Sequence, residues 1–289
     1  MASLLEWFIV SLPVYLKHFV NGPERWAFFV LIPAYIIAQP MLRSYLAQHD
    51  LYKDYRTQWK RLMITYNLLL SLFSLYCAVR MTRVVYWELP GNGYYIDSFN
   101  TSPEYSRIVY VFYLSKYVEF LDTMFLILQK KEVSLLQWIH HVGAPLNVGL
   151  LWLTQDPGAH LFVILNGFIH TLLYLYYVAT ISGIKIKGKW ILTFMQITQF
   201  NVGFYLYTKF TSIPEYARNL ETMASHLFTW CYVGLVEILF LHFFLESYIL
   251  SSPKSSTAKG VINSYSAGSL SGDGPESPLV KGRKVFKNK

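Results

Sequence analysis

Long apolar stretches, each near the length of a membrane-crossing helix, limit the fold of this chain more than any other sequence feature. A helix needs ~20 mainly apolar residues to cross the hydrocarbon core of a bilayer. Only 15% of the 289 residues are charged, against about 25% in soluble domains. The sequence therefore predicts an all-α, polytopic membrane protein with seven transmembrane helices. They are expected near residues 26–42, 62–80, 108–128, 134–153, 159–181, 190–209 and 224–250.

Positive charge is distributed unevenly along this topology. Most Lys and Arg residues fall in the loops on one side and in the C-terminal tail. By the positive-inside rule, the N-terminus is predicted to be lumenal and the C-terminus cytosolic. The net charge of +8 is then explained by topology and by contact with anionic headgroups, so nucleic acid is not an expected partner.

The two ends of the chain differ in composition from its apolar part. Residues 1–25 are predicted to form a lumenal segment with an interfacial helix, because a proline and charged residues interrupt its apolar run. Residues 26–250 form the predicted membrane domain, with residues 86–105 as a folded lumenal cap. Residues 251–289 are rich in Ser, Gly, Pro and Lys, which predicts a disordered, basic cytosolic tail.

Polar side chains interrupt five of the apolar stretches. Ionisable groups inside a span are unfavourable, so they usually face a cavity or a partner and mark function. With a rise of 1.5 Å per residue, six of these groups from five helices lie roughly 9–16 Å from the cytosolic ends of their spans: Asp122, His140, His170, Gln196, Gln199 and His242. We therefore expect one polar chamber that opens to the cytosol. The groups are Lys116, Glu119, Asp122 and Thr123; Gln137, His140 and His141; Asn166, His170 and Tyr174; Gln196 and Gln199; and Glu237 and His242.

Interhelical hydrogen bonding is the alternative explanation for part of this set. Amide and charged side chains often join membrane helices without any chemical role. That explanation stays open for Lys116, Glu119, Gln196 and Gln199. Helix association does not require three imidazoles at one depth. His140, His141 and His170 are therefore the best candidates for catalytic residues.

Four ordered blocks resemble the ELO family of very-long-chain and polyunsaturated fatty acid elongases, over roughly residues 30–248. One block alone would be a weak signal, whereas four in order are specific. The blocks are Lys116-x-x-Glu119-x-x-Asp122-Thr123; the histidine box that ends in His140-His141; Asn166-x-x-x-His170-x-x-x-Tyr174-x-Tyr176-Tyr177; and Thr193-x-x-Gln196-x-x-Gln199-Phe200.

The histidine box departs from the usual family pattern at its first position. The family has His-x-x-His-His, and this chain has Gln137 in place of the first histidine. Such a box followed by Gly143-Ala144-Pro145 is similar to that of algal and protist elongases that act on C18 polyunsaturated acyl chains, including the Δ9-specific type. An amide does not titrate, so the family role of an imidazole at position 137 is in doubt. Leu173 stands where Met is common, a conservative change.

The resemblance implies the condensing step of fatty acid elongation. A very-long-chain 3-oxoacyl-CoA synthase joins malonyl-CoA to a long-chain acyl-CoA and releases CO2 and CoA. The implied fold has seven transmembrane helices, six of which form a barrel around an acyl tunnel in the endoplasmic reticulum membrane. The family needs no metal or redox cofactor of its own. A ketoacyl-CoA reductase, a dehydratase and an enoyl-CoA reductase complete the cycle, and the family often forms homodimers.

The resemblance also assigns roles within the predicted site. Both cysteines, Cys77 and Cys231, fall towards the lumenal ends of their spans, so cysteine catalysis is not expected. Imidazole is a competent acyl acceptor, and by similarity His140 and His170 are the candidates for carrying the acyl group. Which of the two does so stays open.

The remaining site residues are predicted to support these two histidines. His141 and Asn166 are expected to polarise the thioester carbonyl or to hold an enolate. Asp122 and Glu119 are expected to orient the imidazoles. The other supporting or substrate-binding candidates are Lys116, Gln137, Tyr174, Gln196 and Gln199, with Lys185, Lys187 and Lys189 as candidates for the CoA phosphates or simple topology signals. Candidate tunnel ends, or ordinary packing, are Phe204, Tyr207, Phe228 and Trp230.

Two other classes of protein are compatible with parts of this pattern. A membrane desaturase or hydroxylase binds two irons with about eight imidazoles, as its family implies, and this chain has eight histidines in all. Four of them lie near interfaces or outside spans and have no expected catalytic role. A seven-helix transporter or lipid-binding receptor would use the polar chamber for binding alone. The four histidines are His18, His49, His160 and His226.

Overall fold

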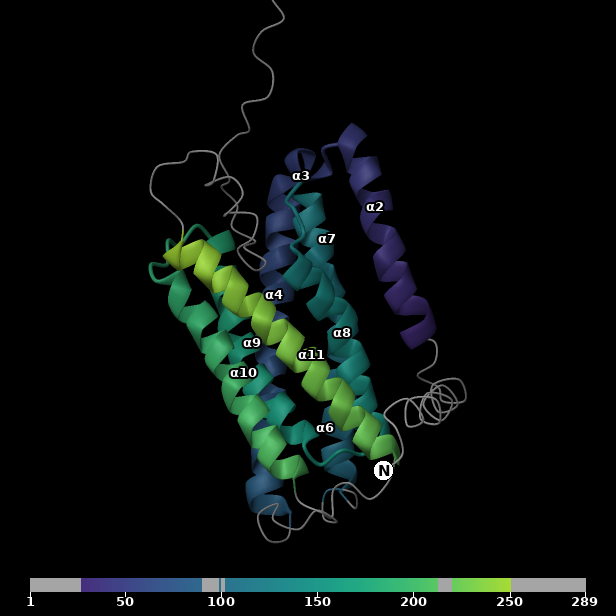
Figure 1. Cartoon of the computed structure of the whole chain (residues 1–289). Coiled ribbons are helices and arrows are strands. Elements are labelled where there is room, and N and C mark those ends of the chain that lie inside the picture. The colour runs from purple at the N-terminus through teal and green to yellow at the C-terminus, as the bar shows by residue number, and fades with distance from the viewer. Residues whose placement is uncertain (1–26, 90–98, 100–101, 213–219, 251–289) are drawn as a thin grey trace, which may run out of the picture.

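A computed structural model describes residues 27–89, 99, 102–212 and 220–250 of the chain. All regular secondary structure in this part is helical (Figure 1). The predicted interfacial helix, most of the predicted cap and the predicted tail lie outside the described residues. Four helices are long and apolar enough to cross a membrane, as judged by length and composition: Phe29–Gln48, Arg56–Glu88, Ala159–Ile181 and Thr222–Ile249.

Each of the predicted apolar stretches contains helix. Turns of π-helix, η1 (Ala27–Leu31), η2 (Val84–Glu88) and η5 (Leu245–Ile249), extend three of the helices. The α-helices are α2 (Ile32–Gln48), α3 (Leu51–Asp54), α4 (Arg56–Arg83), α6 (Pro103–Val118), α7 (Phe120–Leu128), α8 (Leu135–Leu153), α9 (Ala159–Ile181), α10 (Lys189–Thr211) and α11 (Leu220–Phe244).

The third stretch is not the single helix that the sequence predicts. It breaks at Glu119 into α6 and α7. The Glu119 N–H donates to the Ser115 carbonyl at 3.0 Å, and the Asp122 N–H donates to the Glu119 carbonyl at 3.0 Å, three residues apart rather than four. The tighter turn accompanies a buried ion pair between Lys116 and Glu119. Hydropathy does not report such a local change, so the sequence could not place the break.

Six of the helices contact one another in a ring. α4 packs on α9, α9 on α10, α10 on α11, α11 on α8, α8 on α6, and α6 on α4, so these helices form a closed ring of contacts. α2 packs against α7, and it lies at the edge of the bundle in Figure 1. α11 runs diagonally across the front of the same view.

Small residues allow α4 and α9 to approach closely. A Cβ atom at Gly167 would lie 2.9 Å from both the Ala78 Cβ and the Ser74 carbonyl oxygen. The Ser71 hydroxyl donates to the Thr171 carbonyl at 3.0 Å in the same interface. Close packing and interhelical hydrogen bonds stabilise helix pairs in lipid, where apolar burial between helices gives little advantage.

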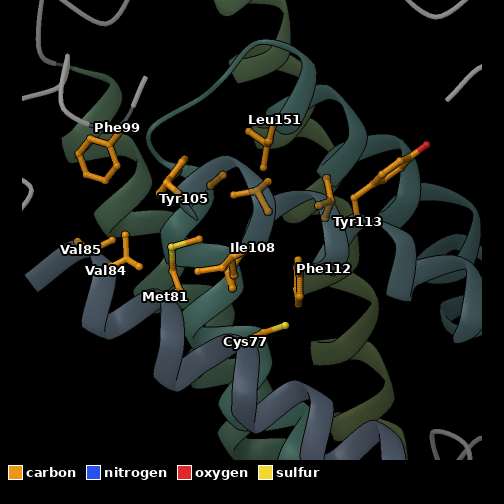
Figure 2. Packing of buried hydrophobic residues seen from close by; sticks show 14 of the residues in the cluster. Cys77, Met81, Val84, Val85, Phe99, Tyr105, Ile108, Phe112, Tyr113 and Leu151 are labelled. Carbon is orange, nitrogen blue, oxygen red and sulfur yellow. The ribbon is translucent and has the colours of Figure 1, made fainter. Parts of the chain in front are cut away.

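A large apolar cluster fills the end of the bundle formed by the C-terminal part of α4 and the N-terminal part of α6 (Figure 2). Cys77 and Met81 on α4 point towards Ile108 and Phe112 on α6. Cys77 and Met81 are 0% exposed. This packing fixes the position of α6 against α4. The polar residues at the C-terminal end of α6 are placed by the same contact.

A buried carboxylate, that of Asp156, connects several elements at the same end of the bundle. Asp156, in the turn between α8 and α9, is 0% exposed. Its carboxylate accepts from the Gly158 N–H at 2.7 Å and from the Tyr207 hydroxyl of α10 at 2.9 Å. His226 of α11 places Nε2 3.0 Å from the same carboxylate. One buried acid thus joins a turn and two helices.

Candidate active site

A cavity between α7, α8, α9, α10 and α11 collects most of the predicted site residues. We call it the polar chamber. Lys116 lies next to it and contacts two of its lining residues. The predicted residues that line it are Glu119, Asp122, Gln137, His140, His141, Asn166, His170, Tyr174, Gln196 and Gln199.

Local sequence places the histidine box at the start of α8. Ser134 caps this helix, with its hydroxyl accepting from the Gln137 N–H at 3.1 Å. Pro145 lies inside the helix and cannot supply the N–H that would bond to the His141 carbonyl. The box therefore lies in the first two turns, between a polar cap and a proline.

Lys116 organises one wall of the polar chamber. Its Nζ lies 2.6 Å from Glu119 Oε1 and donates to Asn166 Oδ1 at 3.0 Å. Lysine is only a donor, so the amide oxygen of Asn166 faces Lys116 and the Nδ2 group is left to donate elsewhere. Glu119 Oε1 also lies 3.5 Å from His170 Nδ1. The predicted role of Glu119 in orienting an imidazole is consistent with this distance.

The imidazoles lie close to one another. The ring centroids of His140 and His170 are 6.3 Å apart, and those of His140 and His141 are 5.5 Å apart. His170 comes from α9, so the two candidate acyl carriers face each other from different helices. Tyr232 of α11 also contacts His140: its hydroxyl oxygen lies 3.3 Å from His140 Nδ1. The sequence reading missed Tyr232, because a single tyrosine in an aromatic-rich span carries no signal.

Gln137 contacts His141 directly. Its Nε2 donates to His141 Nε2 at 2.8 Å and approaches the Thr123 hydroxyl at 3.4 Å. The Tyr35 hydroxyl of α2 lies 3.0 Å from the same threonine oxygen. The amide at position 137 therefore serves as a hydrogen-bond donor, a function that does not require titration.

Asp122 interacts with a tyrosine instead of an imidazole. The Tyr174 hydroxyl donates to Asp122 Oδ2 at 3.0 Å. The Tyr174 ring in turn lies against His170, with centroids 5.6 Å apart. Asp122 could therefore orient His170 only through Tyr174, and its predicted role in orienting the imidazoles stays a prediction.

The seventh stretch contributes less to the polar chamber than the sequence predicts. The prediction that His242 shares the chamber is wrong. Its side chain is 68% exposed, and its Nε2 lies 3.6 Å from Glu246. The prediction rested on depth along the helix, and depth does not say which way a side chain faces.

A second, mostly apolar cavity adjoins the polar chamber. Four residues line both cavities: His140, Asn166, Gln199 and Phe200. Phe204, a predicted tunnel end, lines the second cavity, whereas Tyr207 bonds to Asp156. The apolar side chains of this cavity come from α6, α8, α9, α10 and α11, and include Phe112, Val148, Leu161, Phe162, Leu165 and Phe204.

Lysines lie near the start of α10. Lys185 and Lys187 are exposed in the loop before it. Removal from water lowers the pKa of Lys189 to about 8. Removal from water, with a smaller contribution from nearby Lys189, also lowers the pKa of Lys131 to about 8. The two loops therefore bring two positive charges together, and Lys131 was not among the predicted site residues.

Glu119, His140 and His170 are the described residues that come nearest to a metal site. Each offers one ligand atom, and these atoms lie within 4.8 Å of one another. However, the Lys116 ammonium already occupies a position 2.6 Å from Glu119 Oε1, where it would oppose a metal cation. That no metal or redox cofactor is needed stays a prediction.

The geometry of the described residues does not favour cysteine catalysis or a diiron site. Cys77 is buried in the apolar cluster and Cys231 is exposed, and neither lines the two cavities. A diiron site of about eight imidazoles is not formed by the described residues. His160 and His226 lie at the Asp156 centre instead, with His160 Nδ1 2.6 Å from the Pro157 carbonyl.

These features define a helical membrane protein with a buried histidine site beside an apolar cavity. A family model described as "ELO: GNS1/SUR4 family" matches residues 23–256. The chain belongs to this family, and thus to the membrane proteins of fatty acid elongation in lipid biosynthesis.

Curated relatives extend the comparison over most of the chain. A Gallus gallus protein named "Very long chain fatty acid elongase 6" is 27% identical over 241 residues, covering 81% of this chain and 88% of its own. A Homo sapiens protein named "Very long chain fatty acid elongase 3" is 28% identical over 247 residues, covering 81% and 87%. "Fatty acid elongase 1" of Trypanosoma brucei brucei is 32% identical over 160 residues, covering 51% and 52%.

Proposed function

We propose that the chain is a very-long-chain 3-oxoacyl-CoA synthase that joins malonyl-CoA to a long-chain acyl-CoA. The product is a 3-ketoacyl-CoA two carbons longer, with release of CO2 and CoA. The observation that carries the proposal is the position of His140 and Asn166, which line both the polar chamber and the apolar cavity. A thioester at this junction would have its acyl chain in apolar surroundings and its carbonyl beside imidazole and amide groups.

The reaction would proceed through an acyl-histidine intermediate. An imidazole nitrogen attacks the thioester carbonyl, the C–S bond breaks, and CoA leaves as a thiolate that takes a proton from water. Malonyl-CoA then loses CO2, and the resulting enolate carbon attacks the acyl carbonyl. The C–N bond breaks and its electron pair returns to the imidazole.

Polar neighbours would stabilise the charges that form in these steps. Asn166 has its oxygen bonded to Lys116, so its Nδ2 group can donate to a thioester or enolate oxygen. His141 accepts from Gln137 through Nε2, so this nitrogen is less suited to nucleophilic attack. That contact favours His140 and His170 as acyl carriers and leaves His141 a polarising role.

The CoA phosphates would bind at the loops before α8 and α10. Lys185, Lys187 and Lys189 are the candidates from sequence, and Lys131 joins them through its proximity to Lys189. Phosphate oxygens form strong hydrogen bonds to ammonium groups. In the proposed topology, with the C-terminus cytosolic, this end of the bundle would face the cytosol and would carry the entrance to the polar chamber.

The fold proposal is seven transmembrane helices, with a six-helix barrel around an acyl tunnel. The closed ring of contacts among α4, α6, α8, α9, α10 and α11 supports it. The membrane would be that of the endoplasmic reticulum, with the N-terminus lumenal. The expected partners are the two reductases and the dehydratase of the cycle, and a second copy of the chain.

The proposed acyl substrate is a C18 polyunsaturated chain. Its support is the Gln-x-x-His-His box, in which Gln137 donates to His141. Expression in yeast fed linoleic and α-linolenic acids, with fatty acid profiling, tests both the proposed reaction and the proposed acyl substrate. New C20:2 and C20:3 acids would support it, and the His140→Ala variant should make neither. Elongation of saturated chains alone would overturn the substrate proposal but keep the reaction.

Loss of all elongation, with the protein present in the membrane, would contradict the proposed reaction. It would instead favour a transporter or receptor that binds lipid without changing it. The His242→Ala variant is the matched control, because this exposed histidine does not line the polar chamber. It should elongate the supplied acids as the unchanged protein does.

A further inference from the structure

Tyr232 makes two contacts with one residue of the histidine box. Its hydroxyl oxygen lies 3.2 Å from the His140 carbonyl oxygen and 3.3 Å from His140 Nδ1. The residue lies on α11, and the four sequence blocks do not include it. The hydroxyl therefore contacts the backbone and the ring of His140 at the same time.

Hydrogen-bond chemistry limits how these two contacts can be made together. A carbonyl oxygen only accepts, so the tyrosine hydroxyl donates its single proton to the His140 carbonyl. The same oxygen can then only accept from His140 Nδ1, which must carry a proton. In a neutral imidazole the other nitrogen is unprotonated. This arrangement therefore leaves an electron pair on His140 Nε2.

Close packing fixes the tyrosine ring beside α8. A Cβ atom at Gly143 would lie 2.6 Å from Tyr232 Cδ2 and still closer to Cε2, so glycine permits this approach. One turn away on α11, the Thr229 hydroxyl donates to Asn147 Oδ1 at 2.8 Å. Thr229 and Tyr232 are three residues apart and share a helical face. Two polar contacts and one glycine thus set the position of α11 against α8.

We propose that Tyr232 is a positioning residue that holds His140 in the Nδ1–H tautomer, so that Nε2 is the atom that receives the acyl group. This inference rests on the proposed acyl-histidine chemistry and assigns the acyl group to His140. His170 has a carboxylate, Glu119, 3.5 Å from its Nδ1. A charged partner suits an imidazole that takes up protons, and a neutral hydroxyl suits a neutral nucleophile.

The step balances with these groups alone. The Nε2 electron pair forms the C–N bond, the thioester C–S bond breaks, and the CoA thiolate takes a proton from water. The acylated ring carries a positive charge and keeps its Nδ1 proton, which remains bonded to the Tyr232 oxygen. Attack by the malonyl-derived carbon breaks the C–N bond and returns the electron pair to Nε2.

Removal of the hydroxyl alone tests the proposal. Purified full-length Tyr232→Phe protein is mixed with linoleoyl-CoA without malonyl-CoA, or with palmitoyl-CoA if the feeding experiment selects saturated chains. Loss of one hydrogen bond should slow the first burst of CoA release about tenfold and leave KM for acyl-CoA within about twofold of the unchanged protein. Tyr205→Phe, at an exposed tyrosine of α10, is the matched control and should behave as the unchanged protein.

Peptide mapping of the acylated protein separates this inference from the proposed function. An adduct on His140 with an unchanged burst rate in Tyr232→Phe would overturn the positioning role and keep the acyl-histidine. An adduct on His170 alone would overturn the assignment to His140 but keep the reaction class. Nitrogen NMR of labelled histidine measures the tautomer independently of turnover: a protonated Nδ1 in the unchanged protein and mixed tautomers in Tyr232→Phe are expected. An Nε2–H tautomer in the unchanged protein would overturn the inference.

Gly143→Ala provides a second route to the same hydrogen bond. The added methyl group should displace the Tyr232 ring from His140. Because both changes break one contact, the double variant should be no slower than the slower single variant. If the reductions in burst rate of the two single variants multiplied in the double variant, Gly143 would act independently of Tyr232. The proposed coupling between the two residues would then be refuted.

Discussion

At the scale of single residues, the site depends on which atoms are already engaged. Lys116 holds the Asn166 oxygen, Gln137 occupies His141 Nε2, and Tyr232 contacts His140 Nδ1. Each contact decides which atom is left for a substrate. Residue types and spacing predicted most of the polar residues that line the polar chamber, whereas the pairs of bonded atoms became visible only in the structure.

Substitution of Gln137 tests whether a donor is needed beside His141. Gln137→Leu removes the donor and leaves His141 without this hydrogen bond, so kcat should fall about tenfold. Gln137→His can still donate from a ring nitrogen and should keep most of the activity. Membrane assays with malonyl-CoA and the best acyl-CoA measure both. Equal activity of the leucine and glutamine forms would show that the donor has no role.

At the scale of helices and turns, the buried acid Asp156 holds one end of the bundle. It joins the α8–α9 turn to α10 through Tyr207 and to α11 through His226. The apolar cavity lies between the polar chamber and this end of the helices. Displacement of α10 or α11 here would change the walls of that cavity, since both helices line it.

Asp156→Ala should lower the stability of the folded protein. It leaves the Tyr207 hydroxyl without its buried acceptor and removes the carboxylate beside His226, a loss of about 3–5 kcal/mol for such buried contacts. The thermal midpoint of the protein in detergent should fall by roughly 10 °C. Asp54→Ala, at an exposed acid of α3, is the control and should change it little. An unchanged midpoint in Asp156→Ala would show that the centre does not hold the helices together.

At the scale of the whole molecule, charge and apolar surface are separated along the bundle. Lysines gather at the loops before α8 and α10, the polar chamber follows, and the apolar cavity lies beyond it. A CoA thioester has the same order of charge, carbonyl and hydrocarbon. The arrangement therefore matches the proposed substrate over the length of the molecule.

The lysine pair predicts a pH dependence of substrate binding. Lys131 and Lys189 both have a pKa of about 8, below the usual lysine range, so they are charged at pH 7 and lose protons as the pH rises to 9. If they bind phosphates, KM for acyl-CoA should increase roughly threefold to tenfold over this interval.

A guanidinium group stays charged throughout that range. Lys189→Arg should therefore reduce the rise in KM, whereas Lys209→Arg, at an exposed lysine near the far end of α10, should not. Steady-state kinetics at pH 7, 8 and 9 provide the measurement. A KM that stays constant from pH 7 to 9 in the unchanged protein would exclude these lysines from phosphate binding.

The amino-acid sequence by itself determined the helical class, the positions of the apolar stretches and ten of the polar residues that line the polar chamber. It could do so because the bilayer sets helix length, and because polar groups in lipid need partners. The tertiary structure decided the break at Glu119, the outward direction of His242, the Asp156 centre and the contact of Tyr232 with His140. These depend on the rotation of each helix about its axis and on close approach between helices, and neither is encoded in hydropathy or in the spacing along one segment.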